Sequence, residues 1–132
     1  MRITADTNVL VRAAVQDDAK QTRLAMEAMS SAEKVVLTLP ALCEFVWVLS
    51  QSYRVDRKAI STSIRTLMSS ENVEADVSAI EAGLAMLDAG GDFADGVMAY
   101  EGRRMGAETF VSFDRKAVAL LAAQGEAAQV LA

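Results

Sequence analysis

The stretch VVLTLPALCE, residues 35–44, indicates the fold class more directly than any other part of the sequence. Its first five residues are apolar or β-branched, as expected for a strand that is buried on both faces. Pro40 suits the first turn of a helix, which is predicted to run through Phe45 and Trp47 towards Tyr53. A buried strand that leads directly into a helix is typical of an α/β protein with a parallel sheet.

Strands and helices are predicted to alternate along the rest of the chain. The predicted strands cover residues 2–5, 35–39, 72–76, 109–112 and 128–131. The other predicted helices begin at the capping residues Asp18, Asp56, Ser78, Asp92 and Asp114, and Gly90-Gly91 and Gly106 are stop signals. This order predicts an α/β fold: one domain over residues 1–132, with a small parallel sheet sandwiched between helices.

Composition excludes several classes of protein and of active site. The chain has 132 residues, which suits one domain, and no apolar run approaches the roughly 20 residues that span a bilayer. The first residues lead straight into a strand without a secretory leader, and the single cysteine allows no internal disulfide, so we expect a cytoplasmic protein. With no histidine, the chain excludes Ser-His-Asp catalysis, histidine general acids and His-ligated zinc.

Four acidic residues occupy equivalent positions in the predicted fold. Asp6 follows the first strand, and Asp114 follows the strand at 109–112. Glu44 is predicted in the first turn of the helix after the second strand, and Asp95 in the first turn of the helix after Gly90-Gly91. Because ligands bind at the carboxyl edge of an open α/β sheet, we expect these four carboxylates to converge there.

Converging carboxylates need a cation. Two of them about 4 Å apart repel by roughly 1 kcal/mol in water and about 4 kcal/mol at an effective dielectric of 20. A ligand set made only of oxygen favours Mg²⁺ or Mn²⁺ over zinc or copper. Such ions activate water for phosphodiester cleavage, although the net charge of −5 by itself argues against a general nucleic-acid binder.

Each acid also has a purely structural explanation. Asp6 suits the cap of a turn, and Asp114 an ordinary helix N-cap. Glu44 is favoured by the helix dipole if it lies in a first turn, and Asp92 with Asp95 resembles a capping box made of aspartates. Four acids on one predicted rim, without any of the usual alternative catalysts, favour the metal site.

Four segments together resemble the characteristic motifs of PIN domains, in particular those of bacterial VapC-type toxins. They are DTNVL at residues 6–10, PALCE at 40–44, GDFADGVMA at 91–99 and VSFDRKA at 111–117. The resemblance covers essentially the whole chain in order and approximate spacing. It implies a metal-dependent endoribonuclease with Mg²⁺ or Mn²⁺ as cofactor and RNA as substrate. It also implies a homodimer and an antitoxin protein that covers or enters the acidic pocket.

The same resemblance assigns roles to individual residues. Asp6, Glu44, Asp95 and Asp114 are the implied catalytic acids, and Asp6, Asp95 and Asp114 are the implied metal ligands. The supporting residues are Ser112 beside Asp114, Asn8 or Thr7 beside Asp6, and Asp92 as an outer ligand or cap. Gly96 departs from the family pattern, which commonly has alanine there, and is expected to weaken its helix slightly.

Some residues keep more than one interpretation. Arg115 and Lys116 beside Asp114 are the better candidates for binding RNA phosphates, with Arg103-Arg104 as a second pair. All four could equally be ordinary helix residues whose charges are solvated. The helix at 41–53 is apolar nearly all round, which fits the core, a dimer interface or an antitoxin interface equally. Trp47 and Tyr53 suit either packing or base stacking.

Two other functional classes fit the motifs less well. A phosphoacceptor receiver domain needs an adjacent pair of acids after the first strand and a lysine after the fifth strand. A haloacid-dehalogenase-like phosphatase needs a second aspartate where this chain has Asn8. A PIN fold that serves as a binding module without nuclease activity is the remaining alternative.

Overall fold

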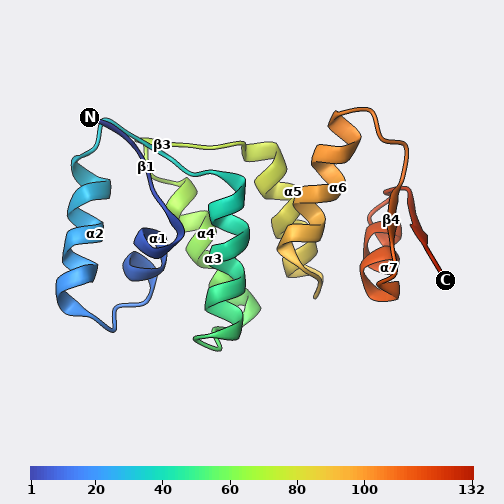
Figure 1. Ribbon diagram of the computed structural model, residues 1–132, viewed down its shortest axis with the longest axis horizontal. Coiled ribbons are helices and arrows are strands. Elements are labelled where there is room, and N and C mark those ends of the chain that lie inside the picture. The colour runs from blue at the N-terminus through green and yellow to red at the C-terminus, as the bar shows by residue number, and fades with distance from the viewer. The chain divides into compact units, whose positions relative to one another are not determined.

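A computed structural model describes all residues, 1–132, as seven helices and five short strands (Figure 1). The strands are β1 (Arg2–Thr4), β2 (Lys34–Val36), β3 (Val73–Glu74), β4 (Phe110–Ser112) and β5 (Ala128–Val130). The helices are α1 (Thr7–Ala14), α2 (Ala19–Ser31), α3 (Leu39–Gln51), α4 (Arg57–Met68), α5 (Val77–Asp88), α6 (Phe93–Arg104) and α7 (Arg115–Ala123). The predicted α/β class is confirmed.

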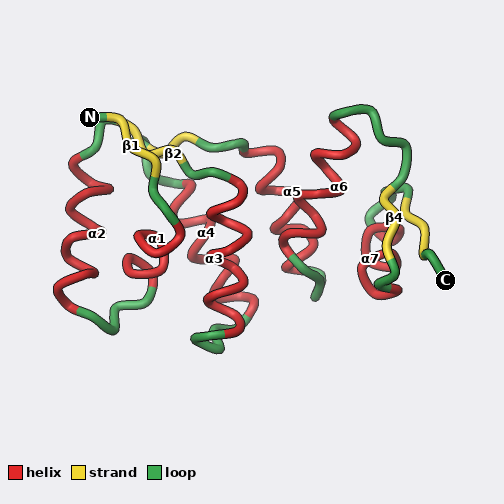
Figure 2. The backbone as a smooth tube through the Cα atoms, viewed as in Figure 1, coloured by secondary structure: helices red, strands yellow, loops and turns green.

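The chain divides into two compact units, residues 1–76 and 77–132. In the first unit β1, β2 and β3 form a parallel sheet in that order, with Ile3 opposite Val35 (Figure 2). In the second unit β4 and β5 form a parallel pair, with Val111 opposite Gln129. All strand pairing is therefore parallel, as predicted, in two small sheets.

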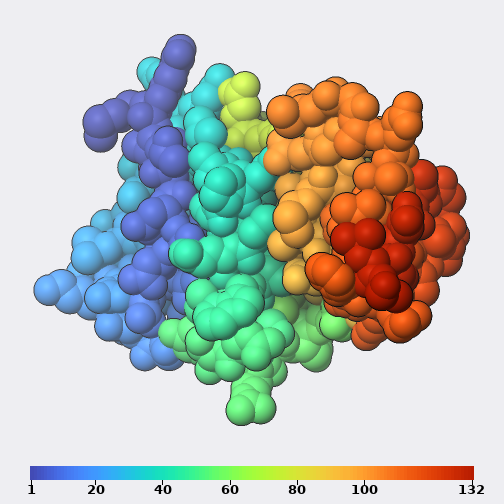
Figure 3. Space-filling model, turned by 45° about the vertical axis from the view of Figure 1, so that its right-hand side comes forward, coloured from blue at the N-terminus to red at the C-terminus, as the bar shows by residue number.

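The core of the first unit follows the apolar faces of its helices. α1 packs on α2 and on α3, and in the space-filling view its dark blue surface adjoins the lighter blue of α2 and the blue-green of α3 (Figure 3). Leu10 of α1 and Phe45 of α3 are fully buried, as are Ile60 and Ile64 of α4. The capping hydrogen bond from Ala59 N to Asp56 Oδ1 (2.8 Å) confirms that α4 begins where Asp56 predicted it.

The core of the second unit is the contact between α5 and α6. Phe93 at the start of α6 is fully buried, and a Cβ on Gly83 of α5 would approach its ring to 2.6 Å. The backbone of α6 at Gly96 lies so close to α5 that a Cβ there would contact the Ala82 carbonyl and would come within 2.9 Å of Gly83 Cα. Gly96 therefore permits close helix packing, which helix propensity alone did not indicate.

Three sequence predictions about element boundaries were wrong. No helix was predicted between Asp6 and Asp18, where the structure has α1, because β-branched Val9 and Val11 lower the helix propensity of this segment. The helix predicted to begin at Ser78 begins at Val77, so Ser78 is not its N-cap. The strand predicted for residues 35–39 ends at Val36, because Thr38 caps the helix that follows.

Candidate metal centre

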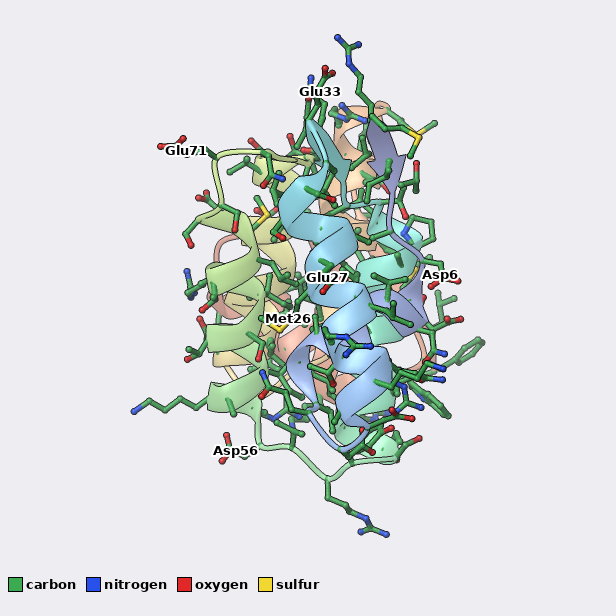
Figure 4. The ribbon with its side chains drawn as sticks, turned by 90° about the vertical axis from the view of Figure 1, so that its left-hand side faces the viewer. Asp6, Met26, Glu27, Glu33, Asp56 and Glu71 are labelled. Carbon is green, nitrogen blue, oxygen red and sulfur yellow. The ribbon has the colours of Figure 1, made fainter.

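Asp6 lies where β1 ends and α1 begins (Figure 4). Its backbone is extended, and its Oδ1 accepts a hydrogen bond from Val9 N at 3.1 Å, so it is the N-cap of α1. The side chain is exposed. Thr7 and Asn8 are the first two residues of the helix, but the hydrogen bond to Asp6 comes from the backbone of Val9. The end of the strand and the cap together fix the direction of this carboxylate.

Glu44 lies in the second turn of α3, and its prediction in the first turn was wrong. The helix begins at Leu39, one residue before Pro40, and Thr38 Oγ1 accepts a hydrogen bond from Ala41 N at 3.3 Å. Glu44 is consequently the sixth helical residue, and its side chain is exposed. Because the helix dipole acts mainly within the first turn, it does not explain an acid at this position.

The N-termini of α6 and α7 carry the other predicted acids. Asp92 caps α6, with Oδ1 accepting from Ala94 N at 3.0 Å, and Asp95 is in the first turn of the same helix, as predicted. Asp114 caps α7, with Oδ1 accepting from the backbone amides of Lys116 (2.9 Å) and Ala117 (3.1 Å).

Ser112 lies beside Asp114. Its hydroxyl oxygen accepts a hydrogen bond from the backbone amide of Asp114 at 3.0 Å. Ser112 is the last residue of β4, so this bond fixes the turn between β4 and α7. The position of the Asp114 carboxylate is thereby set on both sides, by Ser112 before it and by the helix amides after it.

Asp95 is the acid that the structure perturbs most clearly. Burial raises the pKa of its carboxyl, and the negative charges of Asp92 and Asp114 raise it further. Its carboxylate accepts no hydrogen bond, in contrast to those of Asp92 and Asp114. Capping hydrogen bonds thus account for Asp92 and Asp114 but not for Asp95.

The donor set of the second unit suits a hard divalent cation. Asp92, Asp95 and Asp114 supply only carboxylate oxygens, which Mg²⁺ and Mn²⁺ prefer. Residues 77–132 contain eight acidic and four basic residues, so most of the net charge of −5 lies in this unit. No three acidic side chains lie close enough together to share one ion in this structure. The case for a divalent cation therefore rests on the oxygen ligands and on the repulsion that Asp92 and Asp114 exert on Asp95.

The match to a known family identifies which fold with acids at these helix starts the chain has. The PIN domain family model matches residues 3–122. This chain belongs to the PIN-domain family. Members of this family are generally metal-dependent nucleases. No curated protein sequence matches the chain.

The four basic residues of the second unit of this PIN domain fall into two groups. Arg103 forms an ion pair with Glu126 and lies 5.9 Å from the ring centroid of Tyr100, and Arg104 lies 3.8 Å from Glu101. Arg115 and Lys116, at the start of α7, are exposed and form no ion pair. The second pair is therefore the one available to a phosphate.

The apolar helix α3 is mainly a core helix of the PIN domain. Leu42, Phe45, Val46 and Leu49 are buried in the first unit, which accounts for most of its apolar residues. Trp47 is the exception, because 63% of its surface is exposed. Tyr53 lies beyond the end of α3 and is half-buried. No helix of the protein has both the length and the apolar character needed to cross a membrane.

Sequence reasoning did not single out Phe113, which lies between Ser112 and Asp114 and is 79% exposed. The available signal was its position, since an aromatic residue directly before a candidate metal ligand is close to any bound substrate. A large apolar side chain in a loop is ordinarily expected to pack inward, so its exposure required the structure.

Proposed function

We propose that this PIN domain is an endoribonuclease that depends on Mg²⁺ or Mn²⁺ and cleaves RNA phosphodiester bonds. The observation that carries the proposal is the PIN family match over residues 3–122; it is supported by Asp95, a half-buried acid without a capping hydrogen bond, whose pKa is raised by burial and by Asp92 and Asp114. Such a group is unfavourable in its charged form unless a cation accompanies it. The PIN family match supplies the reaction class.

In this proposal Asp6, Asp95 and Asp114 hold the metal. Glu44 completes the set of catalytic acids, and Asp92 is an outer ligand. The chemistry that Mg²⁺ or Mn²⁺ would supply there is a lowered pKa of a water molecule and stabilisation of charge on the phosphate. Ser112 and the amide of Val9 orient Asp114 and Asp6 through the hydrogen bonds described above.

The proposal also treats residues 1–132 as one domain. The family model spans residues 3–122 and so covers most of both compact units. The four proposed catalytic acids are distributed along the chain, with Asp6 and Glu44 in the first unit and Asp95 and Asp114 in the second.

We further propose that the protein is the toxin of a VapC-type toxin–antitoxin pair, acting in the cytoplasm as a homodimer. Support comes from the motifs at residues 91–99 and 111–117, which resemble those of such toxins. An acidic centre attracts arginine, whose planar guanidinium pairs with carboxylates, so the partner is a small basic antitoxin protein or segment. Growth arrest on expression without the neighbouring gene, and recovery on co-expression, tests this role.

The decisive test of the nuclease is cleavage by the purified full chain. RNA should be cut with Mg²⁺ or Mn²⁺ and left intact with excess EDTA. The products should carry 5′-phosphate and 3′-hydroxyl ends, since water rather than the ribose 2′-hydroxyl is the nucleophile. Asp95→Asn should abolish cleavage, whereas Glu108→Gln, which removes an exposed acid of the same unit, should not.

Three results would contradict the proposal. Undiminished cleavage in EDTA would remove the metal, and 2′,3′-cyclic phosphate ends would indicate attack by the ribose. Full activity of Asp95→Asn would remove Asp95 from the centre. If the wild-type chain binds RNA with metal but never cuts it, the protein is a binding module that keeps the PIN fold.

A further inference from the structure

Phe113 is among the most exposed large apolar side chains of the protein. Its surface is 79% exposed, although it lies between two ordered elements, β4 and α7. The buried face of α7 is formed by Ala117, Val118 and Leu121, so the apolar packing of that helix does not include Phe113. The side chain forgoes the burial that an aromatic ring ordinarily gains on folding.

The backbone on both sides of Phe113 is held in place. Before it, Ser112 Oγ accepts the 3.0 Å hydrogen bond from Asp114 N, which closes a turn around Phe113. After it, Asp114 Oδ1 accepts from the amides of Lys116 and Ala117. An aromatic side chain on a fixed turn loses little conformational entropy when a flat ligand stacks on it.

The residues that follow Phe113 supply positive charge. Arg115 and Lys116 are exposed and form no ion pair, unlike Arg103 and Arg104 of α6. Proteins commonly bind single-stranded nucleic acid with aromatic rings next to unpaired basic side chains, because bases stack on the rings while the basic side chains bind the phosphates. This group lies in a unit that is otherwise strongly acidic.

We propose that Phe113 is a stacking platform for an unpaired RNA base beside the bond that is cut, with Arg115 and Lys116 on the flanking phosphates. The proposal rests on the nuclease function proposed above and specifies its substrate as single-stranded RNA. Phe113 is a positioning residue, since it adjoins the metal ligand Asp114 without carrying out chemistry itself. A duplex offers no free base face to Phe113 and is a poor substrate.

The experiment measures RNA binding by the full chain carrying Asp95→Asn, so that the RNA is not consumed. The probe is a fluorescent single-stranded oligoribonucleotide with one abasic site moved along it, and affinity is read by anisotropy. Adding Phe113→Ala should weaken binding of the intact strand by about 5- to 150-fold, the range for loss of one stacked base. Phe113→Trp should restore binding, and Phe113→Leu should not.

The abasic series distinguishes stacking from a merely structural effect. With Phe113 present, an abasic site at one or two positions should weaken binding by a similar factor. With Phe113→Ala, the same abasic sites should have no further effect. The matched control is Met105→Ala, which removes another exposed apolar side chain (83% exposed) from the end of α6, roughly 15 Å along the helix from Asp95.

The outcomes separate this proposal from the one it rests on. If the wild-type chain neither binds nor cuts RNA, both are wrong. If it cuts RNA and Phe113→Ala behaves like Met105→Ala, the platform alone is wrong. The platform is also wrong if Phe113→Ala weakens binding of intact, abasic and duplex RNA equally. It is likewise wrong if Phe113→Ala weakens only the binding of a protein partner. Because Phe113 is exposed, the melting temperature of Phe113→Leu should equal that of the parent.

Discussion

Replacing Asp95 by asparagine should stabilise the metal-free protein while removing its response to metal. The raised pKa of Asp95 means that its ionised form is disfavoured in the folded state relative to the unfolded chain. Burial is the largest cause, and repulsion from Asp92 and Asp114 adds to it. The neutral asparagine removes both penalties and keeps nearly the same shape.

The expected gain in stability is the difference between the charge repulsion that Asp95→Asn removes and the helix-dipole stabilisation that it loses. At an assumed separation of about 8 Å, two unit charges repel by roughly 0.5 kcal/mol in water and about 2 kcal/mol at an effective dielectric of 20. Asp95 is half-buried, so each neighbouring charge contributes a value between these limits. Against this, a first-turn acid gains about 0.3–1 kcal/mol from the helix dipole. Because the pKa is raised and not lowered, the unfavourable terms prevail, and we expect a net gain of about 1 kcal/mol.

Thermal melts of wild type and Asp95→Asn, each with EDTA and with Mn²⁺, measure both effects. Without metal the variant should melt about 3–5 °C higher, the shift that about 1 kcal/mol gives a chain of this size. With Mn²⁺ at a hundred times its dissociation constant, the wild type should gain about 2.7 kcal/mol. The variant should lose most of that gain.

The control for the melts is Glu108→Gln, which removes an exposed acid of the same unit and should leave both the metal-free melt and the metal shift unchanged. The capping explanation predicts a different pattern, because asparagine caps a helix nearly as well as aspartate. If Asp95→Asn keeps the full metal-induced shift, or if it destabilises the metal-free protein, the reasoning about this carboxylate is refuted.

Three further predictions concern stability. Gly96→Ala should destabilise the protein by about 1–3 kcal/mol in chemical denaturation, because the new Cβ would meet the Ala82 carbonyl of α5. Since alanine is the better helix former, a stabilised variant would contradict this close approach. Arg54→Gly should raise the free energy of unfolding by about 0.5–1 kcal/mol, since Arg54 has a left-handed φ of 56° after α3; unchanged stability would show that the conformation costs nothing. In EDTA, the difference in unfolding free energy between Asp95→Asn and wild type should narrow as the pH falls through the raised folded-state pKa of Asp95 towards its unfolded value, 3.8. The reason is that the wild type takes up a proton on folding in this pH range, which stabilises it. A difference that widens on acidification would contradict the raised pKa.

Local capping signals were the most reliable part of the sequence. Asp18, Asp56, Asp92 and Asp114 were each predicted to begin a helix, and each accepts the expected hydrogen bond from a backbone amide two or three residues later. Capping depends on a few neighbouring residues, so it can be inferred without knowing the tertiary structure. Ser78 shows the limit, because its helix already begins at Val77 and Ser78 is therefore not the N-cap.

Packing between elements was not accessible from the sequence. Gly96 was expected to weaken α6 slightly, whereas its main effect is to let α6 approach the backbone of α5. The exposure of Phe113 and of Trp47 likewise depends on which surfaces meet in three dimensions. The sequence placed Asp95 and Asp114 at helix starts correctly, but the raised pKa of Asp95 arises from burial and from charges that only the fold brings near it.

Capping and metal binding are compatible roles for the acids of the proposed centre. Asp6, Asp92 and Asp114 each use Oδ1 to accept hydrogen bonds from helix amides, while their second oxygens accept none. The hydrogen bond fixes the carboxylate plane and leaves one oxygen available to a cation. Asp95 has both oxygens available and sits among like charges, so it gains most from a bound ion. Substitution of the capping acids should therefore affect stability and metal affinity together, whereas substitution of Asp95 should move them in opposite directions.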